Sequence, residues 1–360
     1  MANGMASLMV GSSGLRSAQT ALNTTAHNLS NVNTQGYTRQ QVTFTDTTYA
    51  NVFSSSMVPG KYGLGVDIGA ISRVRNDFID RSYRTEYSRL GFYESQANAV
   101  YEVEDWFGEM QGVTYQQHIT DLYNSINELT KNPTSTIARS SLIQNATAFI
   151  DRSQAIYSGL KDYQITLNTE VSSMVDKINE LGQKIYSLNK SISKVEAGGV
   201  ERANDLRDTR DLALDELSQY LDIDYYETTD GQIIISAENI PFVSKSEVNT
   251  MDVRQEGQYG LLIPEWTAYE KDVFNFEKAA SNANNNDKGK LKGLLVARGT
   301  IDVNYQDVPV MPDKSDYDLT TAEGMAQYNS AMDDYQKQQD YYNKYIEPSA
   351  ILSAIAGFDK

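Results

Sequence analysis

Leucines recur every seven residues near the start of the chain, at Leu8, Leu15, Leu22 and Leu29. Small or apolar residues follow three places after each of them, and alternating steps of three and four keep all these side chains on one face of an α-helix. The pattern predicts a helical seam whose main members are Leu8, Leu15, Ala18, Leu22, Leu29 and Val32. The spacing alone fits either an ordinary amphipathic helix on its own core or a seam that needs a partner helix.

The segment that contains this seam carries almost no charge. Through Thr45 the chargeable side chains are Arg16, His27 and Arg39, and the first acid is Asp46. Burying amides and hydroxyls that find hydrogen bonds costs far less free energy than burying ions. Such a helix can therefore be packed on several sides.

Helical periodicity dominates the middle of the chain from Val74 onward. The Asn132-Pro133 pair predicts the end of a helix, because the residue before proline avoids the α conformation. Thr134 to Glu196 contains no proline, so it predicts one helix of about 60 residues and about 90 Å. Glu201 to Leu221 predicts a return helix that packs antiparallel on this rod. The apolar stripe of the long helix consists of Val171, Met174, Ile178, Leu181, Ile185, Leu188, Ile192 and Val195. In the preceding helix the same spacing runs through Leu90, Tyr93, Ala97, Val100, Phe107 and Met110.

Strand patterns are short and lie on either side of these helices. Residues 41–48 alternate apolar residues with threonines, and Thr229-Asp230-Gly231 predicts a hairpin turn within Ile223 to Val243. Mixed strand signals continue to Phe276, and Ser281 to Lys290 reads as a polar loop. Helical order returns in Lys290 to Gly299, in a tyrosine-rich stretch at residues 321–345 and in an apolar one at residues 348–358. The predicted fold class is mainly α: an elongated rod of long antiparallel helices or coiled coil, with a small β element and a β-rich outer insertion.

Composition narrows the function. The 360 residues carry a formal net charge of −17, which argues against nucleic acid as a partner because phosphate binding needs a basic face. No run approaches the roughly 18 apolar residues of a membrane span. With no cysteine in the chain, disulfides, thiol nucleophiles and thiolate metal sites are all excluded.

Signals for catalysis are weak. The two histidines, His27 and His118, lie in different helices, so no HExxH site exists, and no GxSxG motif occurs. Gly63, Gly65 and Gly69 are spaced GxGxxxG rather than as a dinucleotide fingerprint, which favours a turn and strand. The aspartates near Asp208 are interleaved with arginines and lack the glycine of a calcium loop, so we expect them to pair with those arginines at helical spacing. We expect no enzymatic activity, no cofactor and no metal.

The end of the first helix, AHNLSNVNTQGYTRQ at residues 26–40, resembles the N-terminal signature of bacterial flagellar axial proteins, the rod, hook and hook-associated family. The signature residues are Asn28, Asn31, Asn33, Thr34, Gly36, Tyr37 and Arg39. Asparagines can terminate a helix through bonds to the backbone, and Gly36 permits a positive φ. Tyr37 and Arg39 form a pair suited to an interface. A second stretch, ANDLRDTRDLALDELS at residues 203–218, resembles the hook-associated branch of the family. Its signature residues are Asn204, Asp205, Leu206, Asp208, Arg210, Asp211 and Leu217.

This resemblance implies a structural subunit of the flagellum that forms the first junction zone between hook and filament through helical self-assembly. It implies copies of the chain, the hook protein, the second hook–filament junction protein and a flagellar export chaperone as partners, with neither nucleic acid nor membrane. It also implies an extracellular position on the flagellum, reached through the flagellar export channel without a cleaved signal peptide. The alternatives are another axial protein of the rod or hook and, with less support, a secreted coiled-coil adhesin.

The resemblance also suggests a division of the chain into four parts. Residues 1–45 form an inner axial segment, and residues 46–244 form a long-helix middle domain with a small β element. Residues 245–289 form an outer insertion, and residues 290–360 return to the helical domain. Family members close with a C-terminal helix that pairs with the N-terminal seam, and the chain stops soon after a helix begins at Ser349. We therefore expect the sequence to be a truncated fragment.

Overall fold

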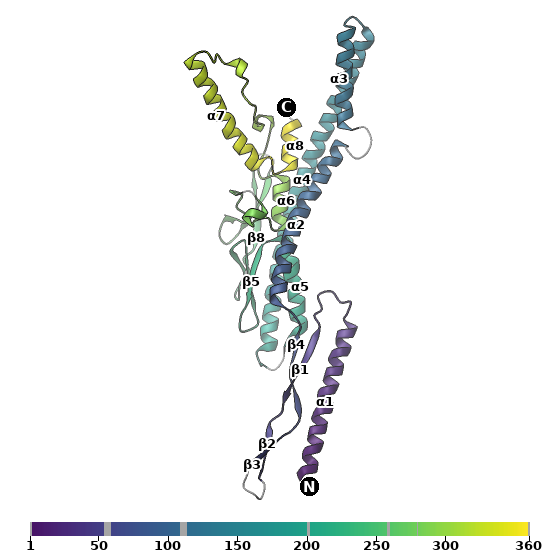
Figure 1. The fold of residues 1–360 in the computed structure, drawn as a ribbon, viewed down its shortest axis with the longest axis vertical. Helices are drawn as coiled ribbons and strands as arrows, with labels where there is room; N and C mark the ends of the chain where they lie inside the picture. Colours follow the sequence, from purple (N-terminus) through teal and green to yellow (C-terminus); the bar gives the residue numbers. More distant parts are fainter. Residues whose placement is uncertain are drawn as a thin grey trace.

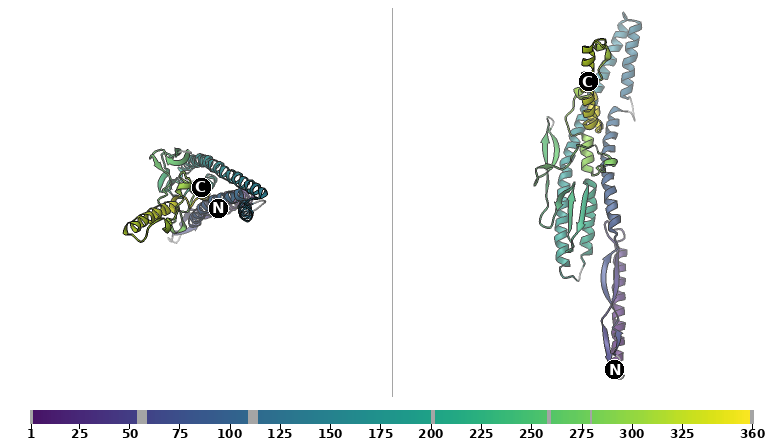
Figure 2. Two further views of the ribbon diagram at one scale, coloured as in Figure 1. Left: turned by 90° about the horizontal axis from the view of Figure 1, so that it is seen from above. Right: turned by 60° about the vertical axis from the view of Figure 1, so that its left-hand side comes forward.

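The computed structural model describes residues 2–53, 59–108, 114–199, 202–257, 260–278 and 280–358. The described chain is mostly helical with small antiparallel sheets, which confirms that the fold is mainly α with small β elements. The molecule is elongated, with a slender unit that contains the N-terminal helix at one end and a thicker assembly of long helices and strands beyond it (Figure 1, Figure 2). We call residues 2–73 the terminal unit and residues 77–358 the body.

The terminal unit pairs one helix with a long β-ribbon. Helix α1 covers Ala2–Ser30. Strand β1 (Gln40–Asp46) pairs antiparallel with β4 (Val66–Arg73), and β2 (Tyr49–Phe53) pairs with β3 (Pro59–Gly63). Figure 1 shows this ribbon running alongside α1. The glycine-rich segment thus lies in a turn and strands, as predicted, and the division expected at residue 45 falls within β1.

Four helices build the frame of the body. They are α2 (Asp77–Phe107), α3 (Tyr115–Lys131), α4 (Thr136–Glu196) and α5 (Asn204–Tyr220). Helix α3 ends at Asn132, as the following proline predicts, and α4 is the single long helix expected, with 61 residues. Ser135 caps α4 by accepting a hydrogen bond from the backbone N–H of Ala138. The predicted return helix exists as α5, although Glu201, its expected first residue, lies outside the described residues.

The apolar stripe of α4 forms the spine of the core. Six of its eight members are buried, whereas Leu188 is half-buried and Val195 is exposed. The predicted helix exists as α2, but its apolar stripe is not the packed face, because Leu90, Tyr93, Ala97 and Val100 are exposed. Met110 lies outside the described residues. Helix α2 instead buries a face rich in small residues, namely Ser88, Gly91, Phe92, Ser95 and Ala99. Small residues let two backbones approach closely, and α6 (Lys290–Arg298) lies against this face.

Two three-stranded sheets cover another side of α4. The first contains β5 (Ile223–Glu227), β6 (Ile233–Ala237) and β7 (Ile240–Val243), with the predicted hairpin between β5 and β6. The second contains β8 (Met251–Glu256), β9 (Leu261–Trp266) and β10 (Lys271–Asp272). Phe242 and Trp266, both fully buried, meet between the two sheets at 5.7 Å between ring centroids. Both sheets therefore belong to the core that α4 organises.

The last part of the chain has one packed helix and one projecting helix. Helix α7 (Ala322–Tyr345) diverges from the body in Figure 1, and Gly324 is its only buried residue within the described chain. Helix α8 (Ala350–Phe358) returns to the core, where Ile351, Leu352 and Ile355 are fully buried. Both helices agree with the predicted segments.

Candidate functional site

The heptad leucines of α1 face solvent. Leu8, Leu15, Leu22 and Leu29 are 69–76% exposed, and Val32 is 71% exposed; Ala18 is exposed as well. The opposite face of α1 holds the β-ribbon, because Ser17 is buried and donates a hydrogen bond to the Val66 carbonyl at 3.3 Å. The seam is therefore an uncovered apolar face that points away from the β-ribbon on which α1 packs.

The signature after α1 builds a tight corner. The Asn28 amide donates to the Gln40 carbonyl at 2.8 Å, and its oxygen accepts from the Gln40 N–H at 2.9 Å and from the Tyr37 hydroxyl at 2.7 Å. The Tyr37 hydroxyl also lies 3.0 Å from Nδ1 of His27. Burial, and secondarily the nearby charges of Asp205 and Asp208, raises the pKa of Tyr37. One asparagine side chain thus ties the start of β1 to the end of the helix.

The other signature residues divide between the corner and the surface. The Asn31 amide donates to the His27 carbonyl at 3.0 Å, and Thr34 donates to the Asn31 side chain. Gly36 adopts φ of +80°, which favours glycine. Tyr37 points inward, whereas the Arg39 and Asn33 side chains are exposed and make no hydrogen bond or ion pair to the described chain. The interface role expected of Tyr37 and Arg39 stays a prediction.

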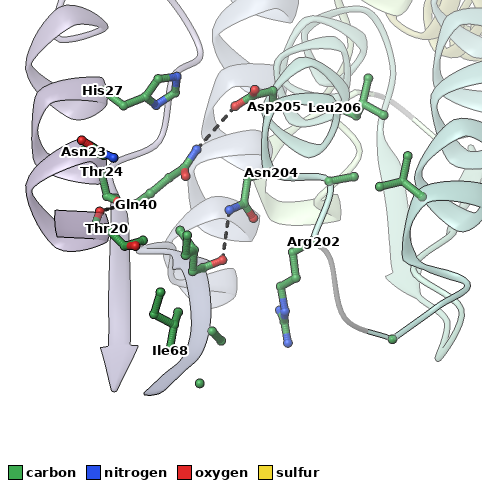
Figure 3. A pocket seen from close by; sticks show the side chains of 16 residues that line it. Thr20, Asn23, Thr24, His27, Gln40, Ile68, Arg202, Asn204, Asp205 and Leu206 are labelled. Atoms are coloured by element: carbon green, nitrogen blue, oxygen red, sulfur yellow. Dashed lines mark hydrogen bonds between the residues drawn. The ribbon is translucent and has the colours of Figure 1, made fainter. Parts of the chain in front are cut away.

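The structure brings the two signatures together although they lie about 170 residues apart in the chain. The Thr38 N–H donates to the Asp208 carboxylate at 3.0 Å, and the Gln40 amide donates to Asp205 at 3.4 Å. The Asn204 amide donates to the Ile71 carbonyl at 3.0 Å, so the start of α5 contacts both β1 and β4. Figure 3 shows these two amides at an open cleft of about 860 Å³ between the terminal unit and α5.

Arginines that sequence reasoning missed complete this junction. Arg73, at the end of β4, contacts Asp208 at 2.9 Å and Asp211 at 2.5 Å. Arg75 contacts Asp211 at 3.2 Å, and Arg84 of α2 contacts Asp215 at 2.7 Å. The expectation that these aspartates pair with arginines of their own helix is wrong, since their partners come from β4, from α2 and from the link between them. The sequence feature that could have predicted these ion pairs is the group of four arginines within residues 73–84.

The remaining residues of the second signature support the body. Arg210 is fully buried, and it donates to the Asn189 side chain at 3.1 Å and to the Gly231 carbonyl at 2.6 Å. Burial lowers the pKa of Arg210 to about 10, and the charge of Glu227 opposes this effect. Leu217 is fully buried in the core, and Leu206 is half-buried. Within the described ranges, no cluster of His, Asp or Glu is arranged to hold a metal ion.

The site is thus an exposed apolar helix face that a polar corner ties to a body of long helices. A family model described as the flagellar hook-associated protein FlgK helical domain matches residues 100–313. A second model, described as flagella basal body rod protein, matches residues 8–38. The first match covers more than half of the chain, so the chain belongs to the flagellar hook-associated FlgK family. The resemblance to flagellar axial proteins is thereby confirmed.

Curated relatives carry the same description. Flagellar hook-associated protein 1 of Bacillus subtilis (strain 168) is 29% identical over 335 residues, which are 88% of this chain and 64% of that protein. Its counterpart in Escherichia coli (strain K12) is 27% identical over 228 residues, 63% of this chain and 41% of that protein. This chain therefore spans less than two thirds of the length of either relative.

A solved structure is also similar. The flagellar hook junction protein FlgK from Burkholderia pseudomallei aligns with a TM-score of 0.47 and 18% identity, over 61% of this chain and 38% of that one. In the part of our chain that the structure describes, none of the helices has the length and apolar character needed to cross a membrane.

Proposed function

We propose that this chain is a structural subunit of the bacterial flagellum that forms the first junction zone between hook and filament. Its family membership and the names of its relatives support this role. The elongated form supports helical self-assembly, in which each subunit contacts several neighbours through different surfaces. A structural role needs no catalytic group, metal or cofactor.

The uncovered face of α1 is the observation that carries this proposal. Isolated exposed leucines are common on soluble proteins, but a row of them along one helix marks an interaction surface. The seam runs along α1 from Leu8 to Leu29, and Val32 lies in the turn that follows the helix. All six side chains are exposed: Leu8, Leu15, Ala18, Leu22, Leu29 and Val32. In our proposal these side chains are buried by helices of neighbouring subunits, in a coiled-coil arrangement with knobs and holes.

The proposed partners are copies of this chain, the hook protein on one side and the second hook–filament junction protein on the other. A flagellar export chaperone would hold the chain before secretion. The chain would reach its extracellular position through the flagellar export channel, without a cleaved signal peptide. Within the chain, we assign the role in axial assembly to the terminal unit. We extend this unit from the expected residue 45 to Arg73, because β4 pairs with β1 along its whole length.

Two alternatives make different predictions. Another axial protein of the rod or hook would share the N-terminal signature. The match of a rod-protein model to residues 8–38 favours this alternative. The long helices α2, α4 and α5 and the extent of the helical-domain match favour the junction protein instead. A secreted adhesin would act through its body, and removal of residues 1–45 would leave its activity intact.

Deletion of the gene separates these roles. A junction protein predicts cells with complete hooks but no filaments, and flagellin shed into the medium. A rod or hook protein predicts cells without complete hooks, and an adhesin predicts cells that swim normally. Complementation with the unchanged gene must restore filaments. Normal swimming of the deletion strain would refute the proposal.

A further inference from the structure

The terminal unit is joined to the body without a shared hydrophobic core in the described chain. The covalent link is a single short segment, Val74 to Asn76. The hydrophobic core extends through α2, α4, α5, α6, α8 and both three-stranded sheets, but among the described residues it includes none from the terminal unit. The angle between the two parts is therefore not fixed by a shared apolar core, which is the usual reason that two parts of a chain move together.

Polar contacts take the place of that core, and they converge on one face of α5. Asn204, Asp208 and Asp211 follow each other at steps of four and three residues, and Asp205 lies three residues before Asp208, so these side chains share one side of the helix. Each of them contacts the terminal unit or the link: Asn204 and Asp205 through single hydrogen bonds, and the two other aspartates through ion pairs. The main apolar contact beside them is Leu212, which packs against Gly36.

Asp208 and Asp211 are the centre of this contact. Both are 6% exposed. Asp208 accepts from the Thr38 N–H and from Arg73, so it holds the beginning of β1 and the end of β4 at once. Asp211 accepts from Arg73 at 2.5 Å and lies 3.2 Å from Arg75. These two neighbouring carboxylates thus contact the chain at the start of β1, at the end of β4 and in the link after β4.

We propose that Asp208 and Asp211 form a carboxylate clamp that fixes the angle of the terminal unit on the body, and that the terminal unit becomes a mobile arm when the clamp is neutralised. This inference does not depend on the flagellar role, because it concerns the isolated chain. Asp208 and Asp211 act as positioning residues: they orient α1 without contributing to its apolar seam.

The physical basis is that charge fixes this angle. Salt screens buried pairs much less than exposed ones, so salt has little effect on these two aspartates. Removal of their charge has a large effect, because it leaves the largely buried Arg73 and Arg75 without their counter-charge. Neutral asparagines should therefore loosen the terminal unit while the body, held by the core around α4, keeps its structure.

The chain offers a direct test because it has no native cysteine. We would introduce Gln19→Cys on α1 and Lys184→Cys on α4, both at exposed positions, and attach spin labels. Pulsed dipolar spectroscopy then measures the distribution of distances between the two labels. The clamp predicts a single narrow distribution at low salt, which becomes at least twofold wider in the Asp208→Asn, Asp211→Asn double variant.

Asp215→Asn is the matched control. It removes the same charge from the same helix, but its closest partner is Arg84 of α2, within the body. Arg84 also lies 3.8 Å from Asp211, and it contacts no residue of the terminal unit through an ion pair in the described chain. Its distance distribution should stay narrow. Equal broadening in the control, or a narrow distribution in the double variant with unchanged circular dichroism, would overturn the proposal.

Arg73→Gln gives a second test, in case the double variant does not fold. It removes the cation that both carboxylates share and leaves α5 unchanged. The clamp predicts that its distance distribution also becomes at least twofold wider, at unchanged circular dichroism. A distribution as narrow as that of the labelled chain without this substitution would overturn the proposal.

Discussion

Substitution of Leu22 tests whether the seam of α1 functions in assembly. The Leu22 side chain is 69% exposed, so little contact is lost within the isolated chain when it is changed. Replacing leucine by aspartate on an exposed helix position costs about 0.5 kcal/mol in helix propensity. Surface substitutions away from special features otherwise stay within about 0.5 kcal/mol. We therefore expect Leu22→Asp to leave the melting temperature and the helical circular dichroism of the isolated chain nearly unchanged.

In the assembly the same change has a much larger cost. Burying one leucine side chain contributes about 1.5–3 kcal/mol, which the variant loses. An unpaired carboxylate at a buried contact adds several kcal/mol more. The sum is on the order of 5 kcal/mol per subunit, and at about 1.4 kcal/mol for each tenfold change it weakens subunit addition by more than about 10³-fold. Cells that carry only Leu22→Asp should therefore shed flagellin and lack filaments.

Two variants at the same position serve as controls. Leu22→Met keeps the volume and apolar character, so it should cost less than about 1.5 kcal/mol and retain filaments. Leu22→Asn removes the apolar contact without adding charge, so it should fall between the two. Electron microscopy counts the filaments of cells that carry each variant, and this count ranks the three variants. Immunoblots of the medium measure how much of each variant is secreted. If Leu22→Asp is secreted, has normal circular dichroism and builds filaments as well as Leu22→Met does, the reasoning is refuted.

Two further predictions concern the body. Hydrogen bonds from Arg207 lower the pKa of Glu196 to about 2, from an ordinary value of 4.5. This carboxylate therefore stabilises the fold above about pH 4.5, and its contribution, on the order of 2–3 kcal/mol, is lost as the pH falls toward 2. Urea unfolding at pH 7 and pH 3 should show a smaller loss in Glu196→Gln, and an equal loss would contradict this. At Gly182 a Cβ would overlap the ring of Phe242, so Gly182→Ala should destabilise the body by about 1–3 kcal/mol in urea unfolding, and no change would contradict the packing.

Local sequence patterns predicted the elements well wherever one signal dominated. Helix α4 carries an unbroken apolar stripe without proline, so its length of 61 residues followed from periodicity. The β5–β6 hairpin followed from its Asp230-Gly231 turn. In α2 the packed face is built from small and polar residues, which hydrophobic periodicity does not detect. Close backbone packing against α6 decided that face, and α6 lies about 200 residues further along the chain.

The candidate site shows the same limit. Both signatures were recognisable, as was the corner that Asn28 builds after α1. The contact between the two signatures could not be predicted, because Thr38 and Asp208 lie 170 residues apart and no local periodicity encodes their contact. The sequence also could not choose partners for the aspartates of α5. Arg207 has the correct spacing to Asp211, but it pairs with Glu196 and Glu227. The carboxylates are therefore left to Arg73 and Arg75.

Accessibility of the seam before and after assembly tests the central claim most directly. Since the chain has no cysteine, Leu22→Cys places one thiol on the seam. The rate of maleimide labelling can be measured in the isolated chain and in purified flagella that contain it. We predict a rate in the isolated chain close to that in the denatured chain, and a rate at least tenfold lower in flagella. Equal rates in the two states would contradict the claim that assembly buries this face of α1.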